Sequence, residues 1–176
     1  QVETVLHQSK NQRWSAFAGV SANRNDSYLR GQSIPLVLGG GEDGWLKSGY
    51  VRAGINGTGR YGRLFWSQNL YGLQGIASFT KNRHLKNLAF YDISPGEARA
   101  VGGYGSLNWL LSPSTAVKLT AGGQWAFNPM PSSMGFSLGG DTGLRGLPGS
   151  FISGDSGWIG STELNWTFWK NERHSL

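Results

Sequence analysis

Residues 99–127 read RAVGGYGSLNWLLSPSTAVKLTAGGQWAF, and their pattern sets the fold class. Two segments, 99–111 and 116–127, alternate apolar residues with polar residues or glycine, which is the period of two of a β-strand with unlike faces. Ser112-Pro113-Ser114 supplies a tight turn between them, so the stretch predicts an antiparallel hairpin. One side carries Val101, Leu107, Trp109, Leu111, Val117, Leu119, Ala121 and Trp125, and the other carries Ala100, Gly102, Tyr104, Ser106, Asn108, Lys118, Thr120, Gly122 and Gln124.

Other segments of the chain repeat this alternation. Residues 13–23, 47–56 and 158–169 alternate clearly, and residues 2–7 do so loosely. In the first of these segments, Phe17 alone interrupts the polar face. These segments predict further strands of about ten residues, each with one apolar and one polar face.

Residues 60–80 are harder to assign, because their apolar phase flips near Gly72. Either a bulge lies there or a hairpin forms around residues 69–72. We predict a single bulged strand. Counted in this way, the chain is all-β and contains about seven strands.

The connections between these segments alternate in length. The short ones are 10–12, 56–59 and 112–114, and the Asn-Gly pair in residues 56–59 readily supplies the positive φ of a hairpin turn. The long ones are 25–43, 81–97 and 128–157. Short and long connections between strands with aromatic ends are typical of an antiparallel transmembrane β-barrel, with turns on the periplasmic side and loops outside. A soluble β-sandwich or lipocalin-like barrel also alternates and stays the alternative.

Composition supports strands and excludes several functions. The 176 residues suit one domain, and they include 28 glycines and 8 tryptophans, which disfavour helices and favour strands and water–lipid boundaries. The absence of cysteine excludes disulfides, thiolate zinc sites and cysteine nucleophiles. No apolar run approaches the roughly 18 residues of a membrane helix, and no signal peptide opens the sequence. The net charge of +6 is scattered, so nucleic-acid binding is not indicated.

A glycine-rich segment with one central arginine follows the predicted hairpin. Residues 136–147 read FSLGGDTGLRGL, residues 154–157 read GDSG, and Glu163-Leu164 lies in the last predicted strand. With Gly123-Gln124 upstream, these blocks occur in the order of the C-terminal signature of two-partner secretion transporters, the haemolysin-activator and filamentous-haemagglutinin type. The chain resembles that family over about its last third. The family pattern places an aromatic residue after the arginine and glycine, and this chain has Leu147 there.

The resemblance implies a sixteen-stranded barrel preceded by two periplasmic POTRA domains. The strands of this chain would be the sixth to the twelfth, so residues 1–176 would form one partial barrel domain, with the POTRA domains and the other strands outside it. Residues 128–157 would be the long extracellular loop that folds inward as a plug. In the family, the loop arginine meets an acidic residue on a later strand, which would lie beyond Leu176.

The resemblance also selects candidate residues in that loop. Arg145 would clip the loop to the pore wall, because a desolvated guanidinium needs a paired acceptor. Glycines would let the backbone approach closely. An exposed arginine on a loop whose glycines only supply turns is the alternative. The loop motif comprises Phe136, Gly139, Gly140, Leu144, Arg145, Gly146 and Leu147.

Three polar residues are expected to face the lumen of the barrel: Gln124, Asp155 and Glu163. Asp155 lies in a Gly-Asp-Ser-Gly block like that around a serine-protease nucleophile. However, none of the three histidines lies in a supporting motif, so we expect no enzyme activity. We also expect no metal site and no cofactor.

The leading functional hypothesis is an outer-membrane pore that exports a large, β-helical partner protein in unfolded form. An insertase of the same superfamily, which folds other barrels into the outer membrane, is the alternative. A soluble ligand-binding barrel is a more distant one. The expected partners are the unfolded exoprotein, outer-membrane lipid and POTRA domains on the full-length chain.

Overall fold

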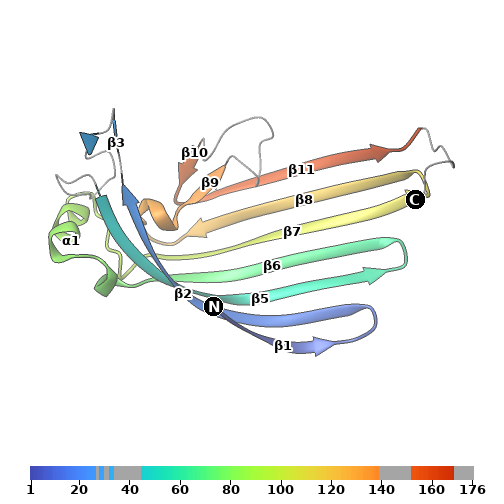
Figure 1. The fold of residues 1–176 in the computed structure, drawn as a ribbon, viewed down its shortest axis with the longest axis horizontal. Helices are drawn as coiled ribbons and strands as arrows, with labels where there is room; N and C mark the ends of the chain where they lie inside the picture. The colour runs from blue at the N-terminus through green and yellow to red at the C-terminus, as the bar shows by residue number, and fades with distance from the viewer. Residues whose placement is uncertain (27, 30–31, 34–44, 139–151, 169–176) are drawn as a thin grey trace.

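The computed structural model describes residues 1–26, 28–29, 32–33, 45–138 and 152–168. Seven long strands of these residues form one antiparallel sheet in which each strand pairs with the next long strand along the chain (Figure 1). They are β1 (Val2–Gln8), β2 (Gln12–Asp26), β5 (Trp45–Tyr61), β6 (Leu64–Gly75), β7 (Arg99–Ser112), β8 (Thr115–Ala126) and β11 (Gly157–Trp166). The predicted all-β class and strand number are therefore confirmed.

Shorter elements lie in the connections at one end of the sheet, here called the loop end (Figure 1). The opposite end, where tight turns join β1 to β2, β5 to β6 and β7 to β8, is called the turn end. The connection between β6 and β7 contains a short helix. The loop-end elements are β3 (Tyr28–Leu29), β4 (Gln32–Ser33), η1 (Ala77–Phe79), α1 (Asn82–Ala89), η2 (Ser132–Met134), β9 (Phe136–Leu138) and β10 (Ile152–Gly154).

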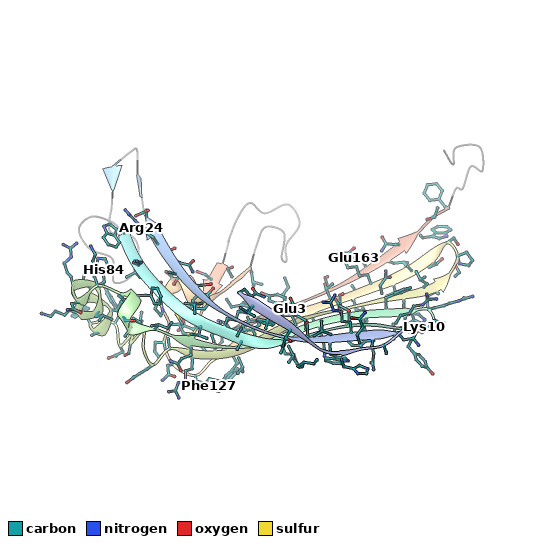
Figure 2. The ribbon with its side chains drawn as sticks, turned by 60° about the horizontal axis from the view of Figure 1, so that its bottom comes forward. Glu3, Lys10, Arg24, His84, Phe127 and Glu163 are labelled. Carbon is teal, nitrogen blue, oxygen red and sulfur yellow. The ribbon has the colours of Figure 1, made fainter. Side chains whose placement is uncertain are left out.

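The register of the strands gives the sheet two chemically different faces. Gln124 of β8 is opposite Gly102 of β7 and Gly157 of β11, so these residues share one face, which also carries Tyr104, Ser106 and Glu163. This polar face is the concave one, with β9 and β10 above it in Figure 2. The other face is apolar and exposed. It carries Val20, Val51, Ile55, Leu70, Val101, Leu107, Leu119 and Leu164.

Tryptophans border the apolar face at both ends of the strands. Trp14, Trp66, Trp109 and Trp166 lie near the turn end, and Trp45, Trp125 and Trp158 lie near the loop end. Between them, the apolar part of β2 runs over eight residue steps, which is about 27 Å at about 3.4 Å per residue. At a strand tilt of about 40°, that length spans about 21 Å across the membrane, which is close to the apolar band of an outer-membrane barrel, about 25 Å tall. Among the described residues, no helix is long and apolar enough to cross a membrane.

The turns predicted at residues 10–12 and 112–114 are confirmed, but the one at 56–59 is wrong. β5 continues through these residues to Tyr61, and the chain turns at Gly62, which has a φ of 59°. Gly57 and Gly59 instead lie under tryptophan rings. A Cβ on Gly57 would come within 2.8 Å of Trp14, and one on Gly59 would come within 2.6 Å of Trp66. Glycine at both positions leaves the space that the rings occupy.

The bulged strand predicted at residues 60–80 is also wrong. β6 begins at Leu64, and its ladders to β5 and β7 run without a register shift. The apolar phase changes because Tyr71 and Leu73 face the polar side, where the loop-end connections bury them to 9% and 8% exposure. The long connection predicted at residues 81–97 holds α1, which the sequence did not predict.

We predict that an added charge destabilises the barrel on the apolar face of a strand but not on its polar face. Leu70 lies midway along the apolar face of β6 and is 48% exposed. In the full-length protein folded into lipid vesicles, Leu70→Arg should lower the free energy of unfolding by about 2–4 kcal/mol, the cost of an arginine at the bilayer midplane. Ser67→Arg, on the polar face of the same strand, is the control and should cost under about 1 kcal/mol. Urea titration measures both, and equal costs would contradict the two-faced assignment.

Candidate functional site: the base of the long loop

The connection between β8 and β11 begins and ends by folding over the polar face. Its first part, from Phe127 to Leu138, includes η2 and β9, and its last described part includes β10. β9 and β10 pair with each other, with Phe136 opposite Gly154. Together these residues form the loop base. It buries a cluster on the concave side, comprising Phe17, Tyr71, Leu73, Ala98, Ala100, Met130 and Met134.

Gln124 ties both ends of the loop base to the wall. Its Nε2 donates to the backbone oxygen of Met134 at 3.0 Å and to that of Asp155 at 3.1 Å. Its Oε1 accepts from the hydroxyl of Tyr71 at 3.1 Å. The side chain is 8% exposed, so these bonds form away from bulk water, where an unpaired polar group is costly. One amide thus joins β6, β8 and the two ends of the loop base.

Phe136 supplies the apolar part of the same attachment. Its ring stacks on Tyr104 of β7, with ring centroids 6.4 Å apart and planes 20° apart. Glycines make room for both rings. A Cβ on Gly157 would lie 2.6 Å from the Phe136 ring, and one on Gly122 would lie 2.3 Å from the Tyr104 ring. At these two positions the wall has no side chain beyond Cα, which leaves space for the rings.

Three serines add hydrogen bonds around this contact. The backbone N–H of Ala126 donates to Ser156 Oγ at 2.9 Å, which fixes the point where the connection returns to β11. The hydroxyls of Ser48 and Ser133 hydrogen-bond to each other, and Ser48 is 1% exposed. The loop base is therefore attached to β5 as well as to β6, β7 and β8.

Arg52 of β5 lies at the edge of this cluster. Its guanidinium carbon is 3.8 Å from the centroid of the Tyr71 ring and 5.8 Å from that of Phe17, so aromatic faces stabilise its charge. Its Nη2 donates to Asn69 Oδ1 at 3.0 Å, and Asn69 Nδ2 donates to Asn56 Oδ1 at 2.7 Å. This network extends the attachment from the aromatic cluster along β5 and β6.

Towards the turn end, the polar face carries a row of hydroxyl groups. Five residues in successive strands lie opposite one another: Thr58, Ser67, Ser106, Thr120 and Ser161. Ser67 and Ser106 hydrogen-bond at 2.8 Å, and Thr120 and Ser161 also hydrogen-bond to each other. These residues remain at least partly exposed. The polar face thus has a part covered by the loop base and an open part that carries this row of hydroxyl groups.

The described structure places four of the predicted site residues. Gln124 of β8 and Phe136 of the loop base both contribute to the attachment, in which Asp155 supplies its backbone oxygen and leaves its side chain exposed. Glu163 lies elsewhere on the polar face, opposite Lys118 in the register of β11 and β8. The remaining predicted positions, Gly139, Gly140, Leu144, Arg145, Gly146 and Leu147, lie outside the described residues.

The sequence did not indicate the roles of Tyr71, Tyr104, Met134 and Arg52. A signal was present in Phe17, which interrupts a polar face, and in the phase change around Tyr71. Both mark apolar side chains on the concave side. Among the described residues, no three His, Asp or Glu side chains gather in a group that could hold a metal ion.

A sheet with an exposed apolar face, tryptophans at both ends and a polar concave face bearing its own loop base is the wall of an outer-membrane β-barrel. The family model "Haemolysin secretion/activation protein ShlB/FhaC/HecB" matches residues 1–176. The chain belongs to this family of two-partner secretion transporters from the outer membrane of Gram-negative bacteria. It is a family of protein transporters and not of enzymes.

A solved structure shows the same fold. CdiB from Escherichia coli matches with a TM-score of 0.72 and 19% sequence identity, over 96% of this chain and 30% of that one. The chain therefore spans about a third of the length of that transporter. No curated protein sequence matches it.

The geometry around Gln124 predicts a specific loss of order in the loop base. Gln124→Leu keeps a similar volume but leaves the oxygens of Met134 and Asp155 without their donor and the hydroxyl of Tyr71 without its acceptor. In the full-length protein, backbone amides of residues 130–138 and 152–157 should exchange with deuterium about ten-fold faster, as expected for a loss of about 1–3 kcal/mol. Hydrogen exchange with mass spectrometry measures this.

Thr120→Val is the matched control, because it removes a polar group from the same face of β8 in the open part. It should leave exchange of the loop base unchanged. Unchanged exchange in Gln124→Leu would show that the amide does not hold the loop base.

Proposed function

We propose that this chain forms part of the wall and the inward-folded loop of a pore that exports a large partner protein, β-helical once folded, through the outer membrane in unfolded form. The family match over the whole chain is the observation that carries this proposal. The attachment of the loop base to the concave face supports it, because both described ends of the connection then lie on the face that a barrel turns toward its lumen.

The polar face suits the passage of an extended chain. An unfolded polypeptide exposes backbone N–H and C=O groups, which serine and threonine hydroxyls satisfy in either sense. The open part of the face presents such hydroxyls on five adjacent strands. Transport needs no cofactor or nucleotide bound to this chain, since extended segments can move by transient pairing with the wall.

Within this proposal, residues 128–157 form the long extracellular loop and act as the plug. Gln124 and Phe136 hold its base, and Arg145 clips its inner part to an acceptor on the wall. Gly139, Gly140 and Gly146 permit close backbone approach, and Leu144 and Leu147 flank the arginine. Glu163 and Asp155 add negative charge to the lumen. POTRA domains on the full-length chain receive the exoprotein in the periplasm.

An insertase that folds other barrels into the outer membrane is the second candidate, because insertases of the same superfamily share the loop arginine. The two candidates differ in what fails when the protein is lost. Loss of an exporter removes one secreted partner, whereas loss of an insertase lowers the amounts of many outer-membrane proteins. Quantitative proteomics of outer membranes and culture medium from a deletion strain distinguishes them.

Arg145→Ala in the full-length protein tests the role of the loop. Export of the partner should fall by at least about ten-fold, since a buried charged hydrogen bond contributes about 1.5–3 kcal/mol. The barrel should remain inserted, because the substitution leaves the seven described long strands unchanged. Immunoblots of the culture medium measure secretion, and heat-modifiable migration of the membrane fraction measures folding.

Arg63→Ala is the control, because Arg63 lies in the tight turn between β5 and β6 at the opposite end of the strands. It removes the same charge and should leave export unchanged. Normal secretion by the Arg145→Ala protein would overturn the proposed role of the loop.

A further inference from the structure

A cluster of basic side chains surrounds Trp45 at the loop end of the sheet. The guanidinium carbon of Arg24 lies 4.9 Å from the centroid of the Trp45 ring, and Nζ of Lys81 lies 4.6 Å from it. Lys47 is the cross-strand partner of Arg24 on the same face. The exposed side chains of Arg24, Lys47 and Lys81 around Trp45 are here called the Trp45 cluster.

The aromatic ring and the helix hold this cluster in place. His84 packs edge-on against Trp45, with ring centroids 4.8 Å apart, and is 1% exposed. Leu88 of α1 is fully buried with Leu46 and Ile93. Figure 2 shows Arg24 and His84 close together at the end of the sheet that carries α1. Lys81 directly precedes α1, so the packing of this helix holds Lys81 beside β5.

The helix extends the basic surface. Arg83 and Lys86 are exposed on α1, and the next residues, Phe90 and Tyr91, are 84% and 50% exposed. Exposed aromatic rings beside basic groups are typical of the boundary between lipid tails and headgroups. Arg24 Nε donates to Asp26 Oδ1 at 3.0 Å, and within the part of the chain that the structure describes, the two Nη nitrogens of Arg24 can donate to a second acceptor.

The position of the cluster along the strands identifies what it faces. On β2 and β5, the exposed apolar pair Val20 and Val51 is followed after four residues by the pair Arg24 and Lys47. This is about 14 Å further along the strands, at the end of the apolar band. Side chains at that level meet lipid headgroups. Because the long loops of outer-membrane barrels are extracellular, the headgroups belong to the outer leaflet.

We propose that the Trp45 cluster binds the phosphate groups of the phosphorylated glycolipid in the outer leaflet of the outer membrane. The arginine offers paired N–H donors to phosphate oxygens, and the two lysines add point charges. Trp45 lies two residues further toward the loop end than Lys47, and its ring holds the charged groups of Arg24 and Lys81 close together. The binding anchors the β2–β5 part of the wall at a fixed depth, and it does not depend on the export function.

The test uses the full-length transporter in detergent, titrated with purified lipid A and with lipid A from which the phosphates have been removed. The variant is Lys47→Gln with Lys81→Gln. Each lost charge should weaken binding of phosphorylated lipid A about five-fold, so the double variant should bind at least about ten-fold more weakly. Native mass spectrometry counts the bound lipid, and binding should weaken further as salt is raised.

Lys10→Gln with Arg63→Gln is the matched control, because it removes two exposed charges at the turn end. It should bind lipid A as the unaltered protein does. Circular dichroism and heat-modifiable migration check folding. Should the double variant fold poorly, Lys81→Gln alone, outside the sheet, must still weaken binding about five-fold.

Three results would overturn the proposal. One is equal binding of lipid A by the Trp45-cluster variant and the unaltered protein. Another is equal binding of the dephosphorylated lipid, which would show that the tails alone are recognised. The third is displacement of lipid A by millimolar inorganic phosphate, which would show that the site takes free phosphate and not the lipid.

Discussion

Backbone hydrogen bonding in the absence of water is the constraint on which this structure depends. Within lipid tails, every N–H and C=O of a strand must pair with a neighbouring strand. In the described sheet, the five inner strands pair on both sides through antiparallel ladders, of which that between β2 and β5 covers Gln12 to Asp26. Side chains are then left to decide what each face contacts. One face is apolar and exposed, and the other is polar and concave.

The concave face is not uniformly wet, because the protein places a small core on it. Phe17, Tyr71 and Leu73 point to this side and are covered by Met130 and Met134 of the loop base. Gln124 lies among them with its amide nitrogen and its oxygen both bonded. A neutral amide with all its hydrogen bonds made costs little free energy to bury. An unpaired amide would be costly to bury and would favour the state in which the loop base is detached and exposed to water. Burial and hydrogen bonding therefore favour the same position of the loop base.

Sequence periodicity predicted the strands whose two faces meet lipid and water, such as the hairpin around Ser112-Pro113-Ser114. Periodicity gave wrong predictions where side chains face neither lipid nor water but are buried inside the protein. The phase change near Gly72 reflects the internal core and not a bulge, and Gly57 and Gly59 admit tryptophan rings and do not form a turn. Neither cause is local, because the rings come from other strands. The sequence also did not predict the hydrogen bonds of Gln124 to the loop base, although it did predict that Gln124 lies on the polar face.

The division of the concave face bears on how a pore could pass a polypeptide. Polar side chains at the loop base are buried and already hydrogen-bonded. A polypeptide passing through the pore would therefore find few hydrogen-bonding groups to bind there. The row from Thr58 to Ser161 offers hydroxyls that already bond to one another, as between Ser67 and Ser106. Such groups can exchange partners with a passing backbone at little net cost, because one neutral hydrogen bond replaces another. Weak, repeated contacts permit both entry and release, which strong charged sites would prevent. In the proposed exporter, an extended chain would therefore move along the hydroxyl row, and the loop base would remain part of the wall.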